Sequence, residues 1–196
     1  VSTNRIEGLS LAHGAGHTFD VRAVDKAGNT SALASSNGIQ VDTQPPSSTV
    51  DVVSNYYNQT YWDQATHIQG SAADGDSESG LTSVEVQIVD STSGNYFNGS
   101  GWTSEASWLV PSGTDSWSYE LPSGDLTDGH DYVVLSRAAD AVGNIQTEYG
   151  QDGFTYDTSE PESYFDLSEQ FYSPSDWDAE VPIQGTSFDA YSGIGT

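Results

Sequence analysis

The feature that most constrains this chain is an internal repeat. The segment RAVDKAGN at 22–29 returns as RAADAVGN at 137–144, so the two copies, counted from Arg22 to Arg137, are 115 residues apart. The same offset pairs further residues: Gly38 with Gly153, Asp42 with Asp157, Thr43 with Thr158, Pro46 with Pro161, Tyr57 with Tyr172, Trp62 with Trp177 and Asp74 with Asp189. Just beyond, the offset falls to 113, because Ser79-Gly80 matches Ser192-Gly193. Self-similarity at a fixed period is the signature of a repeat architecture.

The repeat predicts three parts. Residues 1–41 are the C-terminal part of one unit, residues 42–156 are a complete unit, and residues 157–196 are the N-terminal part of the next. The DTQPP segment at 42–46 stands where one unit ends and the next begins. Because proline restricts the backbone and cannot donate to a sheet ladder, this segment is expected to be a stiff linker.

The complete unit has the pattern of an all-β domain. Short apolar stretches alternate with Gly, Pro, Asn, Asp and Ser clusters, and no helical period is evident. In TSVEVQIVD at 82–90, Val84, Val86 and Ile88 alternate with Glu85 and Gln87, which predicts one buried and one wet face. Strands are expected near 48–53, 66–73, 82–90, 105–110, 116–121, 131–138 and 150–156. Seven strands in a unit of this length predict tandem immunoglobulin-like β-sandwich repeats.

The charge of the chain excludes one class of partner. The 29 Asp and Glu residues face only 4 Lys and Arg residues, a net charge of -25, which repels nucleic acid. The 5 Trp, 11 Tyr and 6 Phe residues favour a packed core over a disordered acidic segment. Because compaction of so much negative charge is costly, bound divalent cations or a salty medium are expected.

Three short motifs resemble bacterial immunoglobulin-like repeats, and the related fibronectin type III-like and hyalin-like repeats, of large surface or adhesin-type proteins. They are A-x-D-x-x-G-N, D-T-x-x-P at the linker, and the D…S-G loop. The resemblance implies the fold and an extracellular or cell-surface setting. The absence of Cys agrees with a bacterial or archaeal surface protein, and no apolar run in this sequence is long enough for a transmembrane segment.

Acidic residues of three segments are expected to meet at one end of the complete unit. In a sandwich of this topology the second-to-third and sixth-to-seventh strand loops share an end, and the linker enters there too. Calcium takes six to eight oxygen ligands from carboxylates, amides and water. The sequence therefore predicts a calcium site; its candidate ligands are Asp42, Asp74, Asp76, Glu78, Asp140 and Asn144. A second, weaker or differently built site is expected around Asp157 and Asp189.

Each of these residues also has a plainer interpretation. Asp25 and Asp140 can accept backbone N–H groups within the turns they begin, with Gly28 and Gly143 at positive φ. Asp74, Asp76 and Glu78 can form an exposed acidic loop. The sequence alone leaves both interpretations open.

No catalytic pattern is present. His13, His17, His67 and His130 have neither metal-ligand spacing nor a triad arrangement, so no enzyme is expected. Aromatic residues are numerous: Tyr56, Tyr57, Tyr61, Trp62, Tyr96, Phe97, Trp102, Trp108 and Trp117. Part of this set is expected in the core, and part can stack on sugars. The sequons at Asn29, Asn58 and Asn98 are weak hints of glycosylation.

The expected function is that of a structural or adhesive spacer in an extracellular stalk, adhesin or filament, stiffened by calcium where units meet. Its partners would be the neighbouring units of the same chain. One alternative is a carbohydrate-binding module that takes surface glycans. Another is a subunit that packs laterally with other copies in a fibre or sheath.

Overall fold

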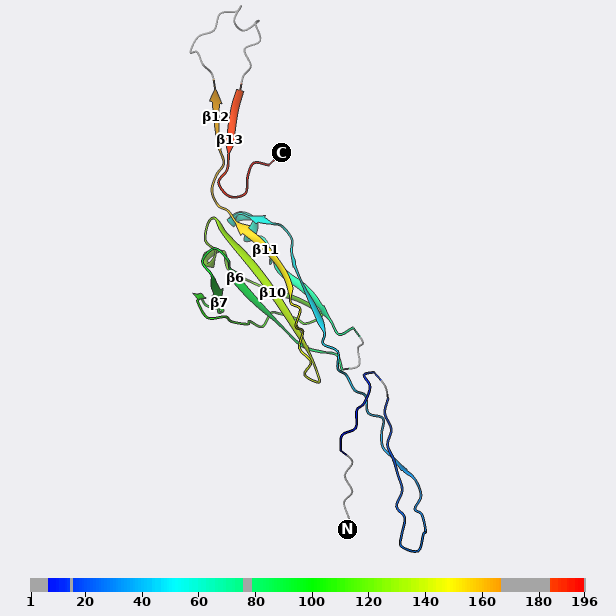
Figure 1. Cartoon of the computed structure of the whole chain (residues 1–196). Coiled ribbons are helices and arrows are strands. Elements are labelled where there is room, and N and C mark those ends of the chain that lie inside the picture. The colour runs from blue at the N-terminus through cyan, green and yellow to red at the C-terminus, as the bar shows by residue number, and fades with distance from the viewer. Residues whose placement is uncertain (1–6, 15, 76–78, 167–183, 196) are drawn as a thin grey trace, which may run out of the picture.

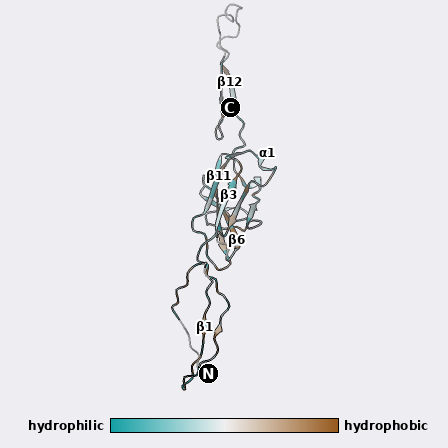
Figure 2. Ribbon diagram, turned by 90° about the vertical axis from the view of Figure 1, so that its right-hand side faces the viewer, coloured by the Kyte–Doolittle hydropathy of each residue, from teal (hydrophilic) through white to brown (hydrophobic). Residues whose placement is uncertain are grey.

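A computed structural model describes residues 7–14, 16–75, 79–166 and 184–195. Three parts follow one another in a line (Figure 1), and a view turned by 90° gives the same arrangement (Figure 2). The N-terminal hairpin contains β1 (Asp20–Val21) and β2 (Ala34–Ser35), and the C-terminal hairpin contains β12 (Glu162–Asp166) and β13 (Gln184–Phe188). Between them lies the central sandwich, which is built from the strands of residues 47–156.

The central sandwich is an all-β fold of two sheets. The larger sheet has the order β4-β11-β10-β6-β7-β8 and the smaller one the order β3-β5-β9. The smaller sheet consists of β3 (Ser47–Val52), β5 (Ile68–Ala73) and β9 (Ser116–Tyr119). The larger sheet consists of β4 (Tyr56–Tyr57), β6 (Leu81–Asp90), β7 (Asn95–Phe97), β8 (Trp102–Thr103), β10 (His130–Asp140) and β11 (Gly150–Tyr156). All these pairings are antiparallel except β4 with β11.

The core lies between the two sheets. Ile68 of β5, Val86 and Ile88 of β6, and Val134 of β10 are 0% exposed. The alternation predicted for 82–90 is correct on this face, since Val84 is buried too. The outer face departs from the prediction at Gln87, which is buried and lies opposite half-buried Leu135 across the β6–β10 ladder. Neighbouring side chains on one sheet face cover each other, so a polar residue there need not be wet.

The strand prediction was wrong in two respects: it placed a strand at 105–110, and it omitted the short strands β7 and β8. Segment 105–110 forms no strand, and Leu109 makes only an isolated bridge with Val86. The neighbouring place along β6 is taken by the short strands β7 and β8, whose pairing is set by local turns rather than by a long apolar alternation. A four-residue helix, α1 (Gln59–Trp62), and the 3-10 turn η1 (Ser123–Asp125) are too short to carry a helical period.

The C-terminal hairpin reproduces pairings of the central sandwich, and the N-terminal hairpin does so in part, because its β1–β2 ladder pairs Asp20 with Ser35 whereas Leu135, one period after Asp20, pairs with Gln151. Glu162 pairs with Phe188 as Ser47 pairs with Ala73, and the offset of 115 residues holds along the whole β12–β13 ladder. The His17–Ile39 bridge likewise corresponds to the Tyr132–Phe154 pair of β10 and β11. The division of the chain at residues 42 and 157 itself stays a prediction.

In the part of the chain that the structure describes, no helix has the length and apolar character needed to cross a membrane.

Candidate metal centre

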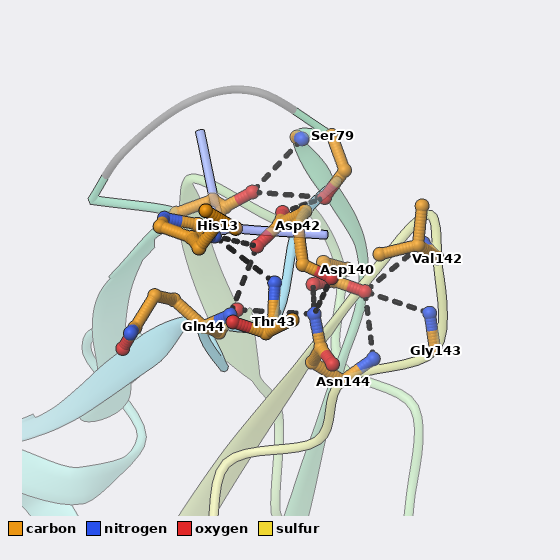
Figure 3. Close-up of polar contacts among 12 residues, drawn as sticks. His13, Asp42, Thr43, Gln44, Ser79, Asp140, Val142, Gly143 and Asn144 are labelled. Carbon is orange, nitrogen blue, oxygen red and sulfur yellow. Dashed lines mark hydrogen bonds and ion pairs between the residues drawn. The ribbon is translucent and has the colours of Figure 1, made fainter. Parts of the chain in front are cut away.

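The central sandwich has one end that faces the N-terminal hairpin (Figure 1), and three carboxylates of the segments at this end converge. Asp42 lies in the linker before β3, Asp74 follows β5, and Asp140 ends β10. Each offers an oxygen, and these oxygens lie within 4.8 Å of one another. Figure 3 shows the polar contacts around them. Sequence reasoning predicted this meeting of linker and loops, whereas ligation of a metal stays a prediction.

Asp140 is held by the turn that it begins. Its Oδ1 accepts the backbone N–H groups of Val142, Gly143 and Asn144 at 3.0, 2.7 and 2.8 Å (Figure 3). Gly143 has φ +95°, a conformation that glycine adopts without steric cost. The predicted turn interpretation is therefore confirmed. It does not exclude a cation, because Asp140 Oδ2 accepts one hydrogen bond from the described residues, that of the Asn144 amide, and keeps lone-pair capacity.

The turn at Asp25 has the same hydrogen bonds in a different setting. Asp25 Oδ1 accepts the N–H groups of Ala27 and Asn29, its Oδ2 accepts the Asn29 amide, and Gly28 has φ +93°. Asp25 is exposed, and among the described residues it belongs to no cluster of three metal-ligating side chains. The D-x-x-G-N motif thus encodes the turn, and the carboxylate cluster needs the linker and the β5–β6 loop as well.

Asp140 is ionised at neutral pH. Burial to 3% exposure raises the pKa of this carboxyl, but the hydrogen bonds from the Asn144 side chain and from the backbone N–H groups of the turn outweigh it. The resulting pKa lies below the usual Asp value. A buried negative charge is thereby fixed beside two further carboxylates.

Asn144 ties the linker to the turn. Its Nδ2 donates to Asp140 Oδ2 at 2.7 Å, to the Gln44 carbonyl at 3.2 Å and to the Asp42 carbonyl at 3.4 Å (Figure 3). Because the amide nitrogen, a donor, faces the Asp140 carboxylate and the linker carbonyls, Asn144 positions the turn against the linker, and ligation through its amide oxygen stays a prediction.

Ser79 joins the other two carboxylates and was missed by sequence reasoning. Its Oγ lies 2.5 Å from Asp42 Oδ2 and 3.3 Å from Asp74 Oδ2, which also accepts the Gly80 N–H at 2.9 Å. A hydroxyl has one proton, so it donates fully to only one of the two carboxylates. The recurrence of Ser79-Gly80 as Ser192-Gly193 was the available signal.

His13 reaches the site from the N-terminal hairpin. Its Nδ1 accepts the Thr43 N–H at 3.0 Å and lies 3.5 Å from Asp42 Oδ1. The imidazole of His13 thus joins the N-terminal hairpin to the linker residues Asp42 and Thr43. Among the described residues, neither Lys nor Arg forms an ion pair with the cluster, and the one Arg ion pair joins Arg137 to Glu85 elsewhere.

The cluster fits a calcium ion by charge and by size. In a shell with metal–oxygen distances of 2.3 to 2.6 Å, ligands on opposite sides of the ion are about 4.6 to 5.2 Å apart, which matches oxygens within 4.8 Å of one another. Asp74 Oδ1 accepts no hydrogen bond from a described residue and is available as a ligand. The three carboxylates can therefore hold a metal, and the bound cation would supply the missing positive charge. The predicted ligands Asp76 and Glu78 lie outside the described residues.

The second predicted site is built differently. Asp157 Oδ2 accepts the Ser192 N–H at 3.1 Å, and Asp189 Oδ1 accepts the N–H groups of Tyr191, Ser192 and Gly193. Within the described ranges these two carboxylates form no group of three metal-ligating side chains. Ligation by Asp157 and Asp189 stays a prediction.

The aromatic residues divide between core and surface. Tyr57, Trp62, Phe97 and Trp117 are buried, as predicted for part of the set. Tyr56 and Tyr61 are 49% and 40% exposed. Half-buried Trp108 carries the Arg137 guanidinium 4.1 Å above its ring, and exposed Tyr149 meets its edge.

The sequon asparagines are exposed, but each has a structural role. The Asn29 Nδ2, to which a glycan would be attached, donates to Asp25. Asn58 caps α1 by accepting the Tyr61 N–H, and Asn98 accepts the N–H groups of Ser100 and Gly101 in its own turn. The structure thus gives each sequon asparagine a role without a glycan.

Comparison with protein-family models gives no match, and neither does comparison with curated proteins. Among solved structures, the chain is similar to a Ca²⁺-stabilized adhesin that helps an Antarctic bacterium reach out and bind ice, with 20% sequence identity and a TM-score of 0.34. The match covers 76% of this chain and 34% of the adhesin chain, so the chain spans about a third of that protein's length. A similarity this weak assigns no function.

Proposed function

We propose that this chain is a structural spacer of an extracellular tandem-repeat protein, in a stalk, adhesin or filament, and that calcium stiffens the joint between its units. The observation that carries the proposal is the convergence of Asp42, Asp74 and Asp140, because one of them lies in the linker and the other two in loops of the sandwich. A cation shared by the three would fix the linker to the domain that it enters.

Electrostatics favours such a cation. Three carboxylates within 4.8 Å repel one another, and among the described residues no Lys or Arg forms an ion pair with them. The chain as a whole carries a charge of -25, which draws divalent cations to its surface. Binding to the folded state alone would stabilise it by mass action.

Two observations support the array. The β12–β13 ladder has the register of β3–β5 shifted by 115 residues, as expected for a next unit that begins in the same way. The strand order, with β3, β5 and β9 facing a sheet centred on β6, β10 and β11, corresponds to strands A, B, E and C, F, G of an immunoglobulin-type sandwich.

The carbohydrate-binding alternative has less support. Four of its candidate aromatics are core residues, and the exposed Tyr61 stacks on buried Tyr57. Binding of the chain to a glycan array would favour this alternative over the spacer. We also propose that the chain has no catalytic role, since His67 bonds to the Tyr61 carbonyl and His130 to Asp90, apart from each other and from the carboxylate cluster.

The test is the response of the chain to calcium. Thermal unfolding and small-angle scattering are measured on the full chain with calcium, with magnesium and with a chelator. The proposal expects a higher midpoint and a stiffer, more extended scattering profile with calcium. An unchanged midpoint and profile would contradict the calcium-stiffened joint.

A further inference from the structure

The second joint, where the central sandwich meets the segment after residue 157, contains an aromatic contact. Gly129, in the turn before β10, has φ +74°. A Cβ atom at this position would stand 2.6 Å from both Cε1 and Cζ of Tyr191, closer than side-chain carbons approach. The Tyr191 ring therefore lies directly on the glycine backbone, and a larger residue at this position would displace the ring, which is 48% exposed.

Hydrogen bonds on both sides of this ring join the same two parts. Asp128 Oδ1 accepts the Thr158 N–H at 2.6 Å, and its Oδ2 accepts the Ser159 hydroxyl at 2.9 Å. Asp157 Oδ2 accepts the Ser192 N–H at 3.1 Å. Backbone and side-chain hydrogen bonds thus cross the joint.

The first joint has the same frame and lacks the ring. His13 and Gly14 stand where Asp128 and Gly129 stand one period later. The Thr43 N–H donates to His13 as the Thr158 N–H donates to Asp128. The backbone N–H of Gly14 and that of Gly129 each donate to the backbone carbonyl of the last residue before the joint. Gly14 has φ +70°, yet no atom of the described chain lies within 4 Å of a Cβ built on it.

We propose that the turn at Asp128-Gly129 is a docking surface for the segment that follows residue 157, and that packing of Tyr191 on Gly129 fixes the second joint without calcium. This inference rests on the proposed function, because it assigns a different fastening to the next joint of the same array. The first joint is then fastened by a cation among carboxylates and the second by an aromatic contact with hydrogen bonds.

The charge state of Asp128 gives the second joint a defined pH range. The hydrogen bond from the Thr158 N–H lowers the pKa of this carboxyl most; burial opposes it by less, and the Ser159 hydroxyl lowers the pKa further. A carboxyl whose pKa is lowered by docking favours the docked state above its ordinary pKa, and this contribution is lost as pH falls through the lowered value. The joint should be unaffected between neutral pH and mildly acidic pH.

Distances between spin labels test the proposal in the full chain, which has no native Cys to interfere. Labels at exposed Ser104→Cys and Ser187→Cys span the second joint, and labels at Ser104→Cys and exposed Lys26→Cys span the first. Double electron–electron resonance is recorded with calcium and with a chelator. The second-joint pair is expected to give one narrow peak under both conditions. Tyr191→Ala is expected to abolish that peak, whereas Tyr164→Ala, a control at an exposed tyrosine of the same hairpin, keeps it.

Two glycine variants separate the ring contact from backbone strain. Gly129→Ala and Gly14→Ala carry the same positive-φ penalty, but only the first collides with Tyr191. Gly129→Ala is expected to abolish the second-joint peak, and Gly14→Ala to leave the first-joint peak unchanged. A second-joint peak that survives Tyr191→Ala, or that chelation abolishes, would overturn the inference. A first-joint peak that chelation leaves narrow would instead overturn the proposed calcium function.

Discussion

Replacing Asp74 by Asn should change stability in opposite directions with and without calcium. Asparagine has nearly the same shape and keeps an oxygen that can accept the Gly80 N–H now bonded to Asp74 Oδ2 at 2.9 Å. The substitution removes one of the three negative charges of the cluster. Without a cation this relieves repulsion, and with a cation it removes a ligand.

The magnitudes follow from the geometry. Two unit charges 4.8 Å apart repel by about 3.5 kcal/mol at an effective dielectric constant of 20 and by about 0.9 kcal/mol in water. Because Asp74 is half-buried, each of its two repulsions is near the value in water, so removing both stabilises the protein by about 2 kcal/mol. The neutral oxygen of asparagine is a weaker hydrogen-bond acceptor than the carboxylate, which costs about 1 kcal/mol. The net gain of about 1 kcal/mol raises Tm by about 4 °C in a domain of this size. At calcium a hundredfold above its Kd, the unsubstituted chain gains about 2.7 kcal/mol, most of which Asp74→Asn should lose.

Calorimetric Tm values of the two proteins, with chelator and with calcium, test this reversal. Glu105→Gln is the control, because Glu105 is exposed and its carboxylate makes neither a hydrogen bond nor an ion pair with a described residue. The control should follow the unsubstituted chain under both conditions. If Asp74→Asn has the lower Tm in chelator, or rises with calcium as much as the unsubstituted chain, the reasoning about repulsion and ligation is refuted.

Three further substitutions probe the surroundings of the cluster and the sandwich. Asn144→Ala removes the amide that joins the linker to Asp140 and should cost about 1 to 3 kcal/mol in urea unfolding; an unchanged urea midpoint would contradict its positioning role. Gln146→Leu deprives the buried Ser48 hydroxyl of its acceptor at 2.7 Å and should cost about 2 kcal/mol by the same measurement, so full stability would show that another group replaces it. Asp90→Asn should flatten the loss of stability in acid. Burial raises the pKa of Asp90, but hydrogen bonds from neighbouring side chains lower the pKa by more, so the folded value lies below the ordinary one. The contribution of Asp90 to stability is therefore present above the ordinary pKa of about 3.9 and is lost as pH falls through the lower folded value. Acid unfolding followed by near-ultraviolet circular dichroism checks this, and parallel curves for both proteins would count against it.

The sequence predicted the elements whose pattern is long and regular. Alternation from Val84 to Ile88 located β6 and its buried face, and the repeat placed Asp42 and Asp140 in comparable settings one period from Asp157 and Asp25. The meeting of Asp42, Asp74 and Asp140 followed from sandwich topology, because loops at one end of the sheets are neighbours whatever their sequence.

Contacts set by individual side chains were out of reach. The recurrence of Ser79-Gly80 marks Ser79 but does not show that its hydroxyl lies between two carboxylates, and the donor orientation of Asn144 has no sequence signal of its own. The role of Tyr191 depends on a ring lying over Gly129, two residues that no periodicity connects. Strands as short as β7 and β8 are fixed by turns and by the edge of β6, so segment 105–110 was mistaken for a strand.

The central claim is that calcium binds among the three carboxylates, and amide resonances during a calcium titration test it most directly. The N–H groups of Gln44, Gly80 and Asn144 donate to Asp42, Asp74 and Asp140 respectively, so each reports on one carboxylate. The account predicts that these three resonances move together in one saturable step, ahead of amides elsewhere on the acidic surface. Shifts that spread evenly over the chain without saturation, or three resonances that stay in place, would contradict it.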